Sequence, residues 1–102
     1  MSEGHFRSVR TRQFKVLFDA LPARVRQSAI NRYKEYFLKN PRHELLERHT
    51  LHDVGDAYPG SIAVNMYYGY RAVAFFVEED HTYVWYWCGS HAEYDRRFRK
   101  GR

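Results

Sequence analysis

The sequence is poor in cysteine and in long hydrophobic runs. Its single cysteine, Cys88, excludes a disulfide within the chain. Together with the lack of an apolar stretch in residues 1–12, this favours the reducing cytoplasm. Every uninterrupted apolar run is far shorter than the roughly 20 residues that a membrane-spanning helix needs. We therefore expect a cytoplasmic protein without a membrane partner.

Motifs of several enzyme and cofactor classes are missing as well. The sequence has no glycine-rich phosphate loop, no nucleophile elbow and no cysteine–histidine arrangement typical of covalent catalysis. His43, His49 and His52 lie near Asp53 and Asp56, but their spacing matches no tight zinc-ligand signature. We therefore expect neither a cofactor nor a metal site.

Positive charge and aromatic side chains are abundant instead. Lys and Arg number 17 against 12 Asp and Glu, a net charge of +5, which favours a polyanionic partner such as nucleic acid or an acidic protein segment. Aromatic residues make up 18% of the chain, which disfavours global disorder. The length of 102 residues is near the commonest domain size. We predict one domain over residues 1–102, with flexible ends at about 1–4 and 99–102.

The first half of the chain predicts two helices. Apolar residues recur at helical spacings in both, namely Phe14, Leu17, Phe18 and Leu21 in the first and Val25, Ala29, Tyr33 and Phe37 in the second. Pro22 separates the two helices, and Asn40-Pro41 ends the second. Because the connection is so short, we expect an antiparallel helical hairpin.

The second half predicts strands. The expected strands are residues 61–67, 71–77 and 82–88, with a weaker candidate at 6–10. Gly69 marks one tight turn, and residues 78–81 form another. In the last strand, Trp85 and Trp87 should share one side. Strands this apolar imply that both faces of an antiparallel sheet are at least partly covered.

A capping box follows the last strand. In Ser90-His91-Ala92-Glu93, the serine and the glutamate would satisfy each other's backbone N–H group at a helix start. The last strand therefore runs straight into a helix that begins at His91. The complete order is β-α-α-β-β-β-α: an α+β fold with a helical hairpin on a small antiparallel sheet and a short C-terminal helix.

His91 at this helix start is a candidate general base. Exposed N–H groups and the positive end of the helix dipole disfavour the imidazolium, and a general base must be neutral. The same N–H groups would suit a phosphate. Tyr94 and Asp95 share the face of His91. Arg71 is a second candidate, because a charge that begins an apolar strand needs water, a carboxylate or a ligand; ordinary snorkelling to solvent is the alternative.

The residues around these candidates resemble one toxin family. The run from Tyr83 to Arg96, with its Gly-Ser-His-Ala-Glu segment, resembles the C-terminal end of bacterial RelE/ParE-superfamily toxins. Gly69-Tyr70-Arg71-Ala72 is similar to the central strand of that family, and Leu21-Pro22 followed by a helix is similar to its hairpin. The resemblance covers residues 6–96 and implies the fold described above.

The resemblance implies the toxin of a type II toxin–antitoxin system. Ribonuclease members cleave mRNA, generally on the ribosome and without a metal. His91 matches the catalytic histidine of the YafQ-like branch, His49 is similar to a second histidine there, and Arg71 corresponds to the central-strand arginine of RelE- and YoeB-like members. The lysine-rich loop of RelE itself is absent. The catalytic candidates are His91, Arg71, His49 and Tyr94. The substrate-binding candidates are Arg48, Asp95 and Arg96.

Two other functions of the same fold remain as alternatives. ParE-like members inhibit DNA gyrase without being enzymes, and the chain could instead be an inactive module that only pairs with an antitoxin. In the nuclease reading, His91 deprotonates the ribose 2′-OH, Arg71 stabilises the developing charge, and His49 or Tyr94 assists the leaving oxygen. The expected partner is an acidic antitoxin that folds around the hairpin or over the basic site, with a higher-order complex possible.

Overall fold

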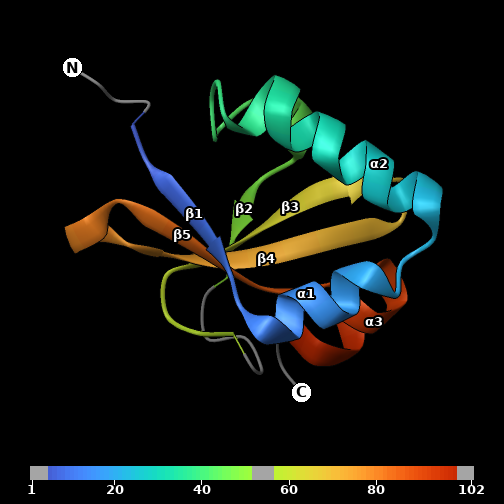
Figure 1. Ribbon diagram of the computed structural model, residues 1–102. Helices are drawn as coiled ribbons and strands as arrows, with labels where there is room; N and C mark the ends of the chain where they lie inside the picture. The colour runs from blue at the N-terminus through green and yellow to red at the C-terminus, as the bar shows by residue number, and fades with distance from the viewer. Residues whose placement is uncertain (1–4, 52–56, 99–102) are drawn as a thin grey trace.

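A five-stranded mixed sheet is the centre of the fold (Figure 1). The computed structural model describes residues 5–51 and 57–98, so the ends expected to be flexible lie outside the described residues. The strands are β1 (Arg7–Arg10), β2 (His49–Thr50), β3 (Ser61–Tyr67), β4 (Tyr70–Val77) and β5 (Thr82–Ser90). Their order across the sheet is β1-β5-β4-β3-β2. The three long strands agree with the sequence prediction, and the short strand β2 is additional.

Three helices cover the sheet. They are α1 (Arg12–Asp19), α2 (Ala23–Arg32) and α3 (His91–Phe98), with single 3-10 turns at Glu44–Leu46 and Glu78–Asp80. The α+β order predicted from the sequence is thereby confirmed. Helices α1 and α2 run in roughly opposite directions, as the hairpin prediction required (Figure 1). They do not pack closely on each other as that prediction expected, because α1 packs mainly on β5 and α2 mainly on β3. No helix in the described ranges has the length and apolar character that crossing a membrane requires.

A π-helical turn at Tyr33–Phe37 continues α2. Its wider winding shows in the hydrogen bond from the Leu38 N–H group to the Tyr33 carbonyl, 2.8 Å long. Twelve residues of a regular α-helix would leave Val25 and Phe37 about 120° apart around the axis. In the structure both are buried in one cluster, 2% and 1% exposed. A π turn has more residues per turn than an α-helix, so it keeps apolar residues spaced four apart on one side of the helix.

Strand β1 corrects the prediction of an antiparallel sheet. It pairs with β5 in parallel, with Arg7 opposite Thr82 and Arg10 opposite Trp85. Tight turns force β3, β4 and β5 into antiparallel neighbours. No such turn links β1 to β5, because nearly the whole chain lies between them. The hydrophobic pattern of residues 6–10 located the strand but carried no information on its direction.

A β-bulge corrects the prediction that Trp85 and Trp87 share a side. Val73 pairs with Trp87 and the next residue of β4, Ala74, pairs with Trp85, so Tyr86 is the extra residue. An inserted residue reverses the alternation of side chains beyond it. Trp85 consequently packs under the helical hairpin, and Trp87 packs on the opposite face against α3.

Both faces of the sheet are covered, as the apolar strands predicted. One cluster contains Phe14, Val25 and Phe37 and defines the hairpin face, under α1 and α2. The other contains Tyr94 and Phe98 from α3 and defines the α3 face. Cys88 is the buried apolar residue that the sequence predicts, and burial raises the pKa of its thiol to about 12.

Candidate active site

The capping box at the start of α3 forms as predicted. The Ser90 N–H group and the Ser90 hydroxyl donate to Glu93 Oε1 over 2.9 and 3.1 Å, and the Glu93 N–H group donates to Ser90 Oγ over 3.2 Å. These hydrogen bonds lower the pKa of the Glu93 carboxyl below its ordinary value of 4.5. The box fixes where the helix begins and therefore where His91 emerges from the sheet.

The helix start is not the open anion site that the sequence analysis expected. The His91 N–H group donates to the Gly69 carbonyl over 2.7 Å, and the Glu93 N–H group is taken by Ser90. Two of the N–H groups that would have bound a phosphate are therefore satisfied within the protein. The Gly69 contact instead ties α3 to the β3–β4 turn, where Gly69 has the positive φ of 72° that favours glycine.

Arg71 reaches His91 from the central strand β4. Its Nη2 lies 3.5 Å from His91 Nε2, and its guanidinium carbon lies 5.0 Å from the centre of the Tyr94 ring. Such a cation–π contact holds the guanidinium in place while its remaining N–H groups stay available to a ligand. Arg71 thus lies beside the proposed base, as the sequence prediction required.

The His91 Nε2 atom has one partner suited to each of its protonation states. An arginine only donates hydrogen bonds, so the Arg71 contact is a hydrogen bond when Nε2 is unprotonated. Asp95 Oδ1 lies 3.8 Å from the same atom and forms an ion pair when Nε2 carries a proton. Both His91 and Asp95 are half-exposed. This nitrogen can therefore accept a proton from a ligand and be stabilised afterwards.

Tyr94 connects the other groups of the site. It is 7% exposed, its ring lies parallel to that of His91 with centres 6.2 Å apart, and its hydroxyl is 3.0 Å from His49 Nε2. Burial raises the pKa of this hydroxyl above its ordinary value of 10.0, and the Arg71 cation offsets the effect only in part. The phenol therefore stays protonated at neutral pH and can donate to His49.

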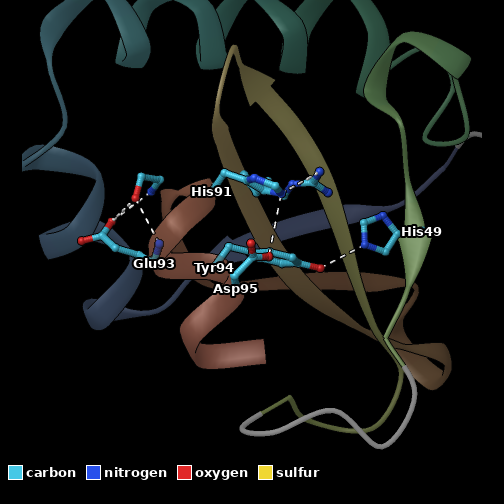
Figure 2. A network of polar contacts seen from close by, with 7 residues as sticks. His49, His91, Glu93, Tyr94 and Asp95 are labelled. Atoms are coloured by element: carbon cyan, nitrogen blue, oxygen red, sulfur yellow. Dashed lines mark hydrogen bonds and ion pairs between the residues drawn. The ribbon is translucent and has the colours of Figure 1, made fainter. Parts of the chain in front are cut away.

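Five of the seven candidate residues converge on the α3 face of the sheet. Figure 2 shows Tyr94 between His91 and His49, with Asp95 beside His91. The side chains come from three elements: β2 contributes His49, β4 contributes Arg71, and α3 contributes the remaining three. The network joins a cation, a carboxylate and two exposed histidines along one continuous surface.

The structure does not bring Arg48 and Arg96 into this network. Arg48 Nη1 donates to the Tyr83 hydroxyl over 3.1 Å and to the Pro41 carbonyl over 3.2 Å. Tyr83 belongs to the hairpin face, so Arg48 points away from His49, its neighbour in sequence. Arg96 is five residues beyond His91, about 140° around the helix, and it acts electrostatically on Glu93.

Two polar residues that the sequence analysis did not select also lie on the α3 face. Asn65 Nδ2 donates to Glu47 Oε1 over 3.2 Å, and Asn65 pairs directly with Arg71 across β3 and β4. One sequence signal could have revealed Asn65. In β3 it lies on the side opposite Val64 and Met66, and apart from Ser61 at the strand start it is the polar residue of an otherwise apolar strand.

Of the histidines considered for a metal, His43 and His49 contact different partners. His43 accepts a hydrogen bond from the Leu45 N–H group at Nδ1 and stacks on Tyr36, with ring centres 4.5 Å apart. His49 contacts Tyr94, and His52 lies outside the described residues. Within residues 5–51 and 57–98, no three His, Cys, Asp or Glu side chains are close enough to share an ion.

Similarity to known proteins is found in structure and not in sequence. No family model and no curated protein matches the sequence. The chain is similar to one in the RelBE2 toxin–antitoxin complex from Mycobacterium tuberculosis, with a TM-score of 0.62 and 14% identity over 83% of this chain and 96% of that one. For the archaeal RelE–RelB complex from Pyrococcus horikoshii OT3, the TM-score is 0.63 at 11% identity, over 84% and 94% of the chains. The chain therefore has the RelE-like toxin fold that its sequence resemblance implies.

Proposed function

We propose that this chain is the toxin of a type II toxin–antitoxin pair and that it cleaves mRNA on the ribosome without a metal ion. Two observations support the proposal. The fold is RelE-like, and a guanidinium and an imidazole that can be neutral lie 3.5 Å apart on an exposed face. The second observation carries the proposal, because these are the groups that transesterification of RNA requires.

The reaction follows from the position of each group. His91 Nε2 takes the proton of the ribose 2′-OH, and the resulting oxygen attacks the adjacent phosphorus. The bond from phosphorus to the 5′-oxygen breaks, which leaves a 2′,3′-cyclic phosphate and a 5′-hydroxyl. Arg71 stabilises the negative charge that develops on the phosphate oxygens. Asp95 stabilises the imidazolium that His91 becomes.

The leaving 5′-oxygen needs a proton, and we assign its delivery to His49 in its imidazolium form, which donates from Nε2 to the Tyr94 hydroxyl and gives up the proton on Nδ1 to become neutral. His49 is exposed, whereas Tyr94 is buried. The phenol is therefore better placed to orient than to reach a substrate. Its hydrogen bond to His49 Nε2 fixes the histidine ring, and its own ring fixes Arg71 and His91. Tyr94 is accordingly a positioning residue in this scheme.

The proposed partner is a cognate acidic antitoxin in the bacterial cytoplasm. Both similar structures are toxin–antitoxin complexes. On the hairpin face, a groove of about 390 Å³ is lined by apolar side chains that include Phe18 and Ile30, and by the cations Arg10, Arg32 and Lys34. An amphipathic segment with acidic flanks fits this combination of apolar floor and positive charge.

The nuclease proposal is tested by the rate and the products of cleavage in a translating extract. His91→Ala should lower cleavage by about 10²–10⁴-fold, the usual cost of losing a proton-transfer group. His5→Ala is the matched control and should cut like the wild type, because this exposed histidine lies beside Asp80 and His81, at the end of β5 opposite His91. The ends should be a 2′,3′-cyclic phosphate and a 5′-hydroxyl.

Three results would overturn this assignment or part of it. A 5′-phosphate on the downstream fragment would mean that water, and not the 2′-OH, attacks the phosphorus. Growth arrest with gyrase inhibition and intact mRNA would mean that the chain is a non-enzymatic gyrase inhibitor. Full cleavage by His91→Ala would remove that residue from the mechanism.

A further inference from the structure

Glu47 and Asn65 extend the candidate site on the side of Arg71 away from His91. Strands β2 and β3 pair with His49 opposite Ala63. Glu47 lies two residues before His49, outside the paired residues of β2, and its side chain accepts a hydrogen bond from Asn65 over 3.2 Å. Asn65 is in turn opposite Arg71. A carboxylate, an amide and a guanidinium therefore lie side by side across the sheet.

This row lies on the same face as the catalytic candidates. Val64 and Met66, the neighbours of Asn65, belong to the cluster on the hairpin face, so Asn65 points to the α3 face. Glu47 lies outside β2, in a left-handed conformation with a φ of 50°, and its hydrogen bond to Asn65 places its carboxylate beside that side chain on the α3 face. Glu47 is exposed and Asn65 is partly exposed, so both are accessible to a ligand.

The chemistry of the pair suits a nucleobase better than a phosphate. After their mutual hydrogen bond, Asn65 retains one amide N–H and its carbonyl oxygen, and Glu47 retains its second carboxylate oxygen. The phosphate is drawn to Arg71, and a carboxylate two strands away repels it. The two remaining acceptor oxygens match the amino group of a base.

We propose that Glu47 and Asn65 bind the base adjacent to the scissile phosphate and select bases with an exocyclic amino group (adenine, cytosine or guanine) over uracil. This inference rests on the proposed nuclease function and gives its site a substrate preference. Glu47 and Asn65, here called the reading pair, lie on one side of Arg71, and His91 lies on the other. Arg71 holds the phosphate between them, so base recognition and cleavage take place on opposite sides of one guanidinium.

The inference is tested by mapping cut sites and by measuring binding. In a translating extract, the wild type should prefer amino-bearing bases at one position next to the cut. Asn65→Ala and Glu47→Gln should lower the ratio of cleavage at amino-bearing bases to cleavage at uracil by about tenfold or more. Total cleavage should change much less. Asn31→Ala and Glu35→Gln change the same residue types on the exposed side of the α2 region, and they should keep the wild-type pattern.

A binding measurement separates this inference from the function on which it rests. His91→Ala protein is titrated with labelled single-stranded RNAs that differ in one base, alone and combined with Asn65→Ala or Glu47→Gln. Discrimination against uracil that disappears in the combined variants supports the reading pair even if no cleavage is found. Cleavage by the wild type with an identical base pattern in both pair variants overturns the inference and leaves the nuclease proposal intact.

Discussion

At the scale of single residues, Tyr94 organises the site because it touches three of its members at once. Its ring lies under Arg71 and beside His91, and its hydroxyl contacts His49. A buried aromatic ring with three such contacts limits the rotamers of all three partners. The reactive groups are thus held by a residue that need not take part in bond making.

Two substitutions of Tyr94 should distinguish the contribution of its ring to kcat from the contribution of its hydroxyl. Tyr94→Phe keeps the ring and loses one hydrogen bond, so kcat should fall by about fivefold. Tyr94→Leu also removes the cation–π contact, and kcat should fall by about a further tenfold. The raised pKa of Tyr94 keeps the phenol protonated below pH 10, so the pH profiles of wild type and Tyr94→Phe should have the same alkaline limb. If the alkaline limb of the pH profile disappeared in Tyr94→Phe, Tyr94 would be the proton donor.

Residue patterns revealed part of the site and missed the rest for a physical reason. The capping box fixes the start of α3, so His91, Tyr94 and Asp95 could be placed on one face from the sequence. Glu47 reaches Asn65 beside β2, a strand of two residues. Such a strand has too few side chains for a periodic pattern, so the sequence does not show that Glu47 lies beside Asn65 and Arg71.

At the scale of elements, the capping box of Ser90 and Glu93 contributes to the stability of the fold and also fixes the helix start that carries His91. Ser90→Ala removes the helix cap and should cost about 1 kcal/mol of unfolding free energy, measured by urea titration. The Glu93 pKa is lowered in the folded state, so its contribution is present above pH 4.5 and is lost as the pH falls through the lowered value. The stability difference between wild type and Glu93→Gln should therefore shrink in acid. A difference that grows in acid would contradict this.

Elements were predictable where local chemistry sets them, and less so where distant strands do. The hydrophobic alternation of residues 61–67 and the box at Ser90 gave the bounds of β3 and the start of α3. The parallel direction of β1 and the bulge at Tyr86 are set by pairing across the sheet. An inserted residue leaves the apolar pattern of β5 unchanged, so the opposite orientations of its two tryptophans could not be read from it.

At the scale of the whole molecule, the two faces of the sheet carry different surfaces. The candidate active site lies on the α3 face, and the apolar groove with its cationic residues lies under the helical hairpin. A partner bound in the groove alone would leave His91 and Arg71 accessible. If the proposed antitoxin binds in the groove, it covers the candidate active site only with a segment that continues around the edge of the sheet to the α3 face.

This arrangement predicts that antitoxin binding and catalysis can be separated by one substitution. Ile30 lines the groove and is 39% exposed, so Ile30→Asp should fold normally. It should weaken binding of the proposed antitoxin by at least about tenfold, because an acid would meet an apolar and acidic segment. Cleavage should be unchanged. Leu38→Asp, at a 46% exposed position outside the groove lining, should bind like the wild type. Equal affinities for wild type and Ile30→Asp in titration calorimetry would place the partner elsewhere, since desolvation of the groove could not then drive the association.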